Sequence, residues 1–233
     1  NGHYYYIKDG DTIWNPGWMP SKTELDSYEC RHGMGYSVFT GVKNGLMAQL
    51  TDFVPMGSTC EINKLTLKNT SDKKKDFSVF SYVEFCLWNA MDDMTNFQRN
   101  FSTGEVEIHV GGSQLFHNAS VDGFDTDRDS FLGAYGENSA PSVVVNDQSK
   151  NSVASGWAPV GSHHLKVALE PGEEKTYIFV LGYVENPVNE KWVGRAEDGI
   201  INRAPADALL ARFDTTEKAD AALAELKAYC CLL

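Results

Sequence analysis

Residues 76–88 constrain the fold of this chain more than any other segment, because they form one long extended run with apolar side chains at odd and even positions. Alternate side chains of a strand point to opposite faces of its sheet. The large side chains therefore divide into two sets, with Phe77, Val79, Val83, Phe85 and Leu87 on one face and Phe80, Tyr82, Glu84, Cys86 and Trp88 on the other. A strand of this kind must be covered on both sides, so the sequence predicts a large sheet inside a layered β-structure.

Turn signals divide residues 1–185 into further strands. Asn44 and Gly45 tolerate positive φ and predict a tight hairpin between residues 36–40 and 46–54. Two more hairpins are expected, one between 61–68 and 76–88 and one between 164–169 and 175–184. Single strands are expected at 105–110 and 129–134. The continuous apolar run at 178–181 favours a central strand that is buried on both faces.

The pattern changes to helical after Pro187. Residues 205–213 predict a short helix, and Asp214, with Glu217 three positions later, has the spacing of a helix N-cap and its capping partner. The second helix runs to Tyr229 with an apolar stripe of Ala219, Ala222, Leu223, Leu226 and Tyr229. We therefore expect a mainly β fold, a large antiparallel β-sandwich over residues 1–186 with a short helical tail over 187–233.

The charge balance excludes some classes of partner. The chain has 20 Lys and Arg against 32 Asp and Glu, a net charge of −12, and so repels nucleic acids and anionic membranes. No apolar run approaches the ~18 residues of a membrane span, and the first residues do not form a signal peptide. The five cysteines have an odd count and no Cys-x-x-Cys spacing, which indicates reduced thiols in a cytoplasmic protein and no zinc site.

Three motifs have partial features of chemical sites but lack a required residue or geometry. Residues 125–129 alternate carboxylates as calcium loops do, but Ser130 stands where Gly is needed and Gly136 where a bidentate Glu is needed. A hydrogen-bonded polar loop is the favoured interpretation there. His163 and His164 are adjacent on an expected strand and so point to opposite faces, which argues against joint metal binding. No Gly-x-Ser-x-Gly elbow supports a serine hydrolase.

Residues 84–101 are the richest segment for ligand recognition. They leave the long strand as a loop dense in amides, carboxylates, an arginine and aromatic rings. Amides and arginine bind sugar hydroxyls, and rings cover the apolar faces of pyranoses. Glu84, Asp92 and Asp93 could also supply the paired carboxylates of a glycosidase, although adjacent aspartates do not easily flank one bond. A polar loop that bonds to its own backbone is the remaining alternative.

Several segments together resemble the cellobiose phosphorylases, the inverting disaccharide phosphorylases of glycoside hydrolase family ninety-four. The resemblance runs over nearly all of the chain and is carried by residues 6–18, 28–33, 84–88, 92–107, 123–133, 156–163 and 181–186. It implies the N-terminal β-sandwich of such an enzyme, shortened by roughly a quarter at its start, with the beginning of the linker helices. The stretch at 108–122 is shorter than in the family.

The resemblance also implies where the chemistry lies. In this family the catalytic machinery is an (α/α) barrel that follows the linker, and that barrel is absent from this chain. Inorganic phosphate is the co-substrate, splitting cellobiose into glucose 1-phosphate and glucose, so a single general acid suffices and no cofactor is needed. The resemblance therefore implies that no residue of this chain is catalytic.

The subunits of the family pair, and the loop after the long strand reaches the sugar site of the partner subunit. By position, the resemblance assigns Asn89, Gln98 and Arg99 to contacts with the glucosyl acceptor. The implied partners are a glucose- or cellobiose-type sugar and either a second copy of the chain or a catalytic barrel. Two other hypotheses stay open at this point: a stand-alone glycosidase of the β-glucosidase or glucanase type using Glu84, Asp92 or Asp93, and a carbohydrate-binding module.

Overall fold

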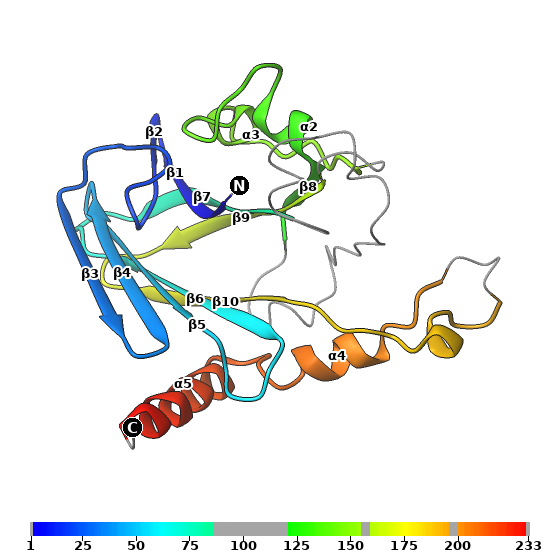
Figure 1. The fold of residues 1–233 in the computed structure, drawn as a ribbon. Coiled ribbons are helices and arrows are strands. Elements are labelled where there is room, and N and C mark those ends of the chain that lie inside the picture. The colour runs from blue at the N-terminus through cyan, green and yellow to red at the C-terminus, as the bar shows by residue number, and fades with distance from the viewer. Residues whose placement is uncertain (1, 86–120, 155–158, 196–199, 232–233) are drawn as a thin grey trace.

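Two five-stranded antiparallel sheets face each other in the computed structural model, which describes residues 2–85, 121–154, 159–195 and 200–231 (Figure 1). The first sheet has the order β2 (Thr12–Trp14), β1 (His3–Asp9), β7 (Lys75–Glu84), β9 (Pro159–Leu169) and β8 (Gly123–Asp127). The second has the order β10 (Glu174–Gly182), β6 (Cys60–Asn69), β5 (Leu46–Phe53), β4 (Tyr36–Lys43) and β3 (Ser27–Gly33). The predicted β-sandwich is confirmed.

Strand β7 is covered on both faces, as its sequence requires. Phe77 and Val79 join the core between the two sheets, together with residues such as Leu65, Leu67 and Leu165. Phe80 and Tyr82 lie on the other face, under the short helices α2 (Arg128–Leu132) and α3 (Ser142–Val145). Figure 1 shows these two helices on the outside of the first sheet. The described part of the strand ends at Glu84, and the predicted positions from Cys86 onward lie outside the described residues.

One of the three predicted hairpins is confirmed and two are wrong. Asn44 and Gly45 turn with φ values of 51° and 74° between β4 and β5, which pair along their length. By contrast, β6 and β7 lie in different sheets, and so do β9 and β10. Both connections cross from one layer of the sandwich to the other. The apolar positions of these strands face the same inter-sheet core, so each strand meets its sequence neighbour across the core and not edge to edge.

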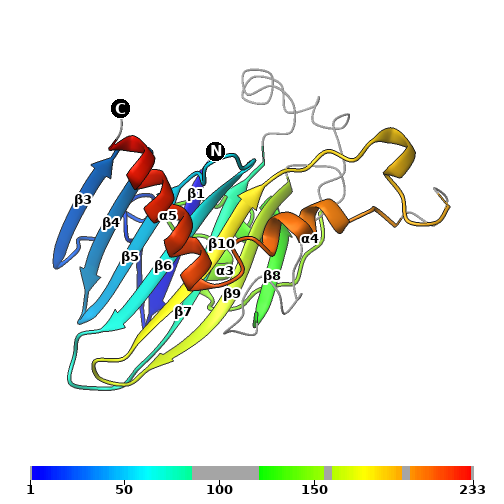
Figure 2. The same ribbon diagram turned by 90° about the horizontal axis from the view of Figure 1, so that it is seen from below.

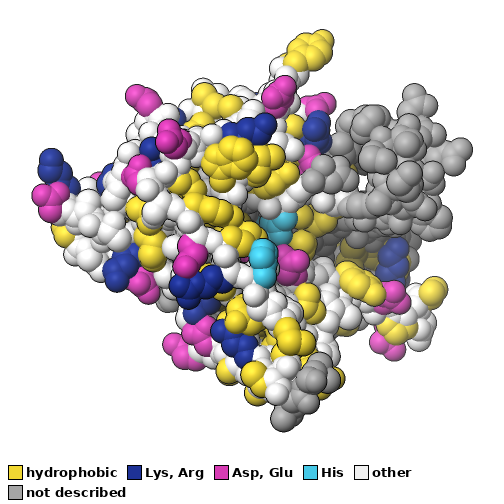
Figure 3. Space-filling model, turned by 60° about the vertical axis from the view of Figure 1, so that its left-hand side comes forward, with side chains coloured by type: hydrophobic (Ala, Val, Ile, Leu, Met, Phe, Trp, Pro, Cys, Tyr) yellow, Lys and Arg dark blue, Asp and Glu magenta, His cyan; other side chains and the backbone are white. Residues whose placement is uncertain are grey.

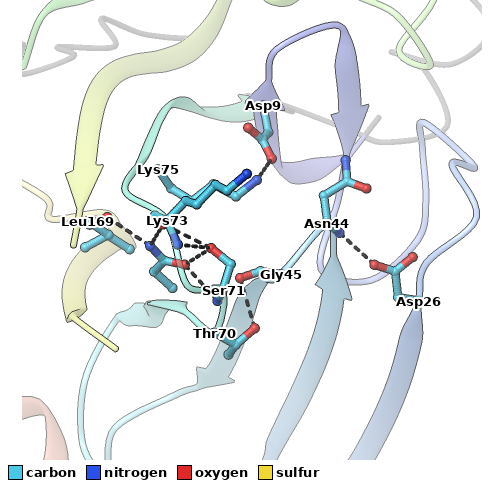
Figure 4. A network of polar contacts seen from close by, with 10 residues as sticks. Asp9, Asp26, Asn44, Gly45, Thr70, Ser71, Lys73, Lys75 and Leu169 are labelled. Carbon is cyan, nitrogen blue, oxygen red and sulfur yellow. Dashed lines mark hydrogen bonds and ion pairs between the residues drawn. The ribbon is translucent and has the colours of Figure 1, made fainter. Parts of the chain in front are cut away.

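A single buried asparagine joins the two crossings. Asn69 is 0% exposed, and its amide nitrogen donates to the carbonyl oxygens of Lys73 at 2.7 Å and Leu169 at 3.0 Å. Its amide oxygen accepts hydrogen bonds from the backbone and the hydroxyl of Ser71. Ser71 and Lys73 precede β7, whereas Leu169 ends β9, and Figure 4 shows these residues meeting at one end of the sandwich.

Two local predictions about single strands need correction. The sequence predicts a strand at residues 129–134, but residues 129–132 belong to helix α2. The helix forms because the side chain of Asp127 accepts a hydrogen bond from the backbone of Ser130 and caps its N-terminus. The apolar run at 178–181 is buried on both faces, since Phe179 faces the inner core and Ile178 faces the outside. However, β10 stands at one end of the described strand order and is not central. The strand expected at 105–110 lies outside the described residues.

The helical tail lies against the sandwich. Helix α5 (Thr216–Cys230) follows α4 (Ala204–Leu210) and a short 3₁₀ turn at Val188–Glu190. Figure 2 shows α5 lying across the outer face of the second sheet. Ala219 and Leu226 of its predicted stripe are buried there against residues that include Phe53, Ile62 and Ile178, while Tyr229 remains 48% exposed.

The start of α5 differs from the prediction by one residue. Thr215 is the N-cap and accepts from the backbone of Lys218, whereas Asp214 binds the ammonium group of Lys218 at 2.6 Å. Threonine and aspartate are both good N-caps, and the ion pair gives Asp214 another role. In the described part of the chain, no helix is both long and apolar enough to cross a lipid bilayer.

Candidate functional site

Polar side chains gather at the end of the sandwich where β7 ends and β9 begins. We call this the polar end and define it by His3, Asp52, Glu61, Ser81, Glu84 and His163. In the first sheet, His3 pairs with Val83, next to Glu84. In the second sheet, Asp52 pairs with Asn63, and the 3.4 Å contact of His3 with Glu61 joins the two sets. The inter-sheet space next to these residues is filled by an apolar core that includes Leu65, Val79 and Leu165. The polar end is also where the predicted sugar-recognition segment leaves the sheet.

Glu84 is the one predicted acidic candidate that the structure describes. Its side chain is 9% exposed, and Oε1 accepts hydrogen bonds from the hydroxyl of Tyr82 at 2.6 Å and from Nε of Arg128 at 3.1 Å. Burial raises the pKa of Glu84, whereas hydrogen bonds from Tyr82, the amino terminus and Arg128, together with the terminal charge, lower it, and the net shift is downward. Glu84 is therefore held as a carboxylate that accepts hydrogen bonds, and it ties the end of β7 to the first turn of α2.

We expect Glu84→Gln to lower the free energy of unfolding by roughly 1–3 kcal/mol, because Arg128 would lose its charged partner. Urea unfolding at pH 7 measures this. The matched control is Glu29→Gln, since the exposed pair of Glu29 with Arg31 contributes about 0–1 kcal/mol. The pKa of Glu84 is lowered, so its contribution is present above the ordinary carboxyl range and is lost as the pH falls through the folded pKa. A difference that persists unchanged in acid would contradict this assignment.

A second acidic group lies between the sheets at the same end. Glu61 Oε1 accepts from the amide of Asn63 at 2.7 Å and lies 3.4 Å from Nδ1 of His3, and the hydrogen bond with His3 is the main cause that lowers the pKa of Glu61. Asp52 differs, because burial, followed by the charge of Glu61, raises its pKa to about 7. The polar end thus holds one ionised carboxylate beside one that is largely protonated below neutrality.

An open hollow of about 350 Å³ adjoins these acids and is lined by residues that include Gly33, Tyr36, Asp52 and Glu61. Oδ1 of Asp52 is buried and has no hydrogen-bond partner among the described residues. Figure 3 shows a face of the molecule on which histidine side chains lie beside acidic ones, with apolar side chains around them. The chemistry of this hollow suits a hydrogen-bond donor more than an anion.

The two adjacent histidines point to opposite faces, as predicted. Nδ1 of His163 lies 3.1 Å from Oγ of Ser81 on the inner face of the first sheet, whereas His164 stacks on Phe80 with ring centroids 4.1 Å apart on the outer face. In the same sheet, Asp125 accepts hydrogen bonds from the backbone of Lys150 and Ser152, so the polar-loop interpretation describes its carboxylate. Within the described ranges, no group of three or more potential ligands has the geometry of a metal site.

A second hollow lies beside α2, on the outside of the first sheet. It measures about 680 Å³ and is lined by residues that include Arg128, Asp129, Tyr135 and Lys150. Tyr135 is fully exposed and has a φ of 60°. Most of the charged groups here are already used within the fold, since Arg128 binds Glu84 and the ammonium of Lys150 donates to the carbonyl of Ser130.

The residues predicted to contact sugar, Asn89, Gln98 and Arg99, lie outside the described residues, as do Asp92 and Asp93. The structure therefore places Glu84 alone among the predicted site residues. It adds His3, Asp52, Glu61 and Arg128, which the sequence reasoning missed. One signal could have found Asp52: it continues the inward positions Leu46, Ala48 and Leu50 of an otherwise apolar face.

Taken together, the fold is an antiparallel supersandwich with a helical tail and a polar end from which the candidate recognition segment departs. Residues 1–216 match the family described as "Glycosyl hydrolase 94, supersandwich domain". The chain belongs to glycoside hydrolase family 94.

Curated relatives support this assignment. The chain is 29% identical to an N,N'-diacetylchitobiose phosphorylase of Vibrio furnissii, over 97% of this chain and 28% of that protein. It is 34% identical to an N,N'-diacetylchitobiose phosphorylase of Vibrio proteolyticus, over 78% of this chain and 25% of that protein. It is 35% identical to a solabiose phosphorylase of Paenibacillus borealis, over 75% of this chain and 25% of that protein. The chain spans about a quarter of the length of these relatives.

Proposed function

We propose that this chain is the non-catalytic sandwich of a phosphorylase that splits a cellobiose-type disaccharide with inorganic phosphate. The observation that carries the proposal is the match of residues 1–216 to the supersandwich domain of family 94, together with relatives named as disaccharide phosphorylases. Phosphorolysis by inversion needs one general acid, because phosphate itself is the nucleophile. In the proposal that acid and the phosphate-binding groups belong to a catalytic barrel outside this chain.

The state of Glu84 supports the non-catalytic assignment. A general acid must be protonated near neutral pH, which requires a raised pKa. Glu84 is instead stabilised as a carboxylate by Tyr82 and Arg128. Its place at the end of β7 suits an anchor for the segment that follows. We therefore assign Glu84 a positioning role.

In the proposal, Asn89, Gln98 and Arg99 contact the acceptor sugar, and the sandwich supports pairing of two subunits. An amide and a guanidinium offer donors for sugar hydroxyls, and the segment leaves the sheet beside the anchored Glu84. The barrel, or a second copy of the chain, completes the sugar site. Cellobiose is the proposed substrate, and the two disaccharides named for the relatives serve as the competing outcomes.

The test compares the isolated chain with the protein in which it is joined to a family 94 barrel. We expect the isolated chain to release no glucose 1-phosphate from cellobiose and phosphate, and the joined protein to release it. In the reverse reaction, Arg99→Ala should raise KM for glucose by roughly tenfold or more, as expected when a charged hydrogen bond of about 1.5–3 kcal/mol is lost. Arg31→Ala, at an exposed position on β3, is the matched control.

Two outcomes would overturn the proposal. Sugar release by the isolated chain that is lost in Glu84→Gln would support the stand-alone glycosidase. Preference of the joined protein for N,N'-diacetylchitobiose or solabiose over cellobiose would reject cellobiose as substrate while retaining the phosphorylase. Intact mass of the natural protein shows directly whether a barrel accompanies this chain.

A further inference from the structure

A row of polar side chains on strand β3 has no part in the proposed sugar chemistry. Cys30 and His32 are two positions apart and so lie on the same face, and His32 pairs with Ser37 of β4 in the strand register. Sγ of Cys30 lies 3.2 Å from Nε2 of His32, and Nδ1 of His32 lies 2.8 Å from Oγ of Ser37. A thiol, an imidazole and an orienting hydroxyl thus form one chain of hydrogen bonds.

This arrangement has the geometry of an activated nucleophile. The thiolate is the reactive form of cysteine, and an adjacent base that is itself oriented by a third group favours it. When Nε2 acts as the base, Nδ1–H of His32 donates to Oγ of Ser37, and this hydrogen bond holds the ring so that Nε2 faces the sulfur. His32 also meets the ring of Phe39 edge to face at 6.0 Å, which further limits its rotation.

The row is reachable from solvent. Strand β3 stands at one end of the described strand order of its sheet, and His32 is exposed while Cys30 is partly exposed. Tyr28, on the same face, is 49% exposed, and its pKa is raised by burial and then by the charge and the hydrogen bond of Cys30. A small molecule could approach the sulfur at this position without opening the sandwich.

The other described cysteines lack this environment. Cys60 is 4% exposed, and burial raises its pKa, which disfavours the thiolate. Sγ of Cys230 donates to the carbonyl oxygen of Met34. Cys231 is exposed at the end of α5 and, among the described residues, makes no hydrogen bond to a histidine. Cys231 is therefore the internal reference for an ordinary accessible thiol.

We propose that Cys30 is a reactive thiol, assisted by His32, that exchanges with small disulfides to form a reversible mixed disulfide on the edge of the sandwich. His32 takes the proton of the Cys30 thiol, and Sγ attacks one sulfur of the disulfide. A new S–S bond forms as the old one breaks, and the departing thiolate takes the proton from His32. A small thiol reverses the step, so no other oxidant or reductant is required.

The test measures modification rates by peptide mass spectrometry in the full-length protein that carries this chain, with oxidised glutathione and, separately, iodoacetamide as probes. We expect Cys30 to react roughly tenfold faster at pH 7 than Cys231 and than free N-acetylcysteine.

His32→Gln should reduce the rate at Cys30 roughly tenfold and leave Cys231 unchanged, and Ser37→Ala should reduce it by a smaller factor. Arg31→Gln, one position away on the opposite face of β3, is the matched control and should have no effect on the rate. Urea midpoints equal to that of the wild type show that each variant is folded. Equal rates at Cys30 and Cys231, or a rate at Cys30 that His32→Gln does not change, would overturn the proposal.

Discussion

Asn69→Asp is expected to destabilise the sandwich by roughly 3–5 kcal/mol, the largest loss that a single isosteric change should produce here. The amide nitrogen of Asn69 donates to the carbonyl oxygens of Lys73 and Leu169, and the side chain is fully buried. In the aspartate, an oxygen that cannot donate while ionised would face both carbonyls. A proton on that oxygen would restore one of the two donors at most.

The expected loss is large because Asn69 holds two crossings at once. Its backbone also bonds to the opposite turn, with its nitrogen donating to Glu173 and its carbonyl accepting from Gly172. Figure 4 shows how the turn before β7 and the end of β9 come together. Loss of these bonds weakens the β6–β7 and β9–β10 connections, each of which passes from one sheet to the other.

Urea unfolding at pH 7 measures the effect of Asn69→Asp. The matched control is Asn146→Asp, because Asn146 is exposed and donates from the end of α3 to the carbonyl of Ser142. We expect the control to lose less than about 1 kcal/mol. Equal losses for the two variants would show that Asn69 does not join the crossings. Asn69→Asp should also regain part of its stability as the pH is lowered, because the new carboxyl group would then be protonated.

The same turns show what the sequence can and cannot predict about the fold. Alternation of large side chains along 76–88 predicts a strand covered on both faces, and the structure confirms this for the described part, which ends at Glu84. A turn signal, however, states only that the chain reverses. A hairpin within one sheet and a crossing between two sheets place the same alternate residues in the core, so local pattern did not distinguish them. The hairpin predicted at Asn44 and Gly45 is correct because the positive φ values of these two residues fit a two-residue turn within one sheet.

Short elements were the other source of error. Residues 129–134 contain Phe131 and Leu132, an apolar pair that fits a strand or a helix equally well. The N-cap hydrogen bond to the side chain of Asp127 favours the helix over the strand. At the start of α5, Asp214 and Thr215 are adjacent residues that could each cap the helix. Asp214 instead forms an ion pair with Lys218, and Thr215 is the N-cap.

The candidate site was harder to predict than the fold. A dense run of polar and aromatic residues indicated 84–101 as a recognition segment, and Glu84 is the described member of its predicted site. The polar end depends on His3, Asp52 and Glu61, which come from three strands in two sheets. Their proximity follows from strand order, and strand order is what the mistaken hairpins left undetermined.

The pH dependence of stability should be dominated by Asp52. Its pKa is raised from 3.8 to about 7 by burial and then by the charge of Glu61, so the folded chain binds a proton more tightly than the unfolded chain does. The stabilising contribution of the protonated Asp52 is therefore fully present below the ordinary pKa of an aspartate, 3.8, and is lost as the pH rises to about 7. Above that range, folding must bury a charge whose Oδ1 has no hydrogen-bond partner among the described residues.

Asp52→Asn should therefore stabilise the chain by about 2 kcal/mol at pH 8 and change little at pH 4, because the amide cannot ionise. Urea unfolding at both pH values measures this, and Asp26→Asn is the control with the opposite sign, since the backbone of Asn44 and then Lys43 lower the pKa of Asp26. Glu61→Gln should reduce the gain from Asp52→Asn, because the charge of Glu61 is the second cause of the shift. An Asp52→Asn variant that is less stable than the wild type at pH 8 would mean that the carboxylate has a binding partner in this hollow, and that Asp52 is ionised there for a purpose other than stability.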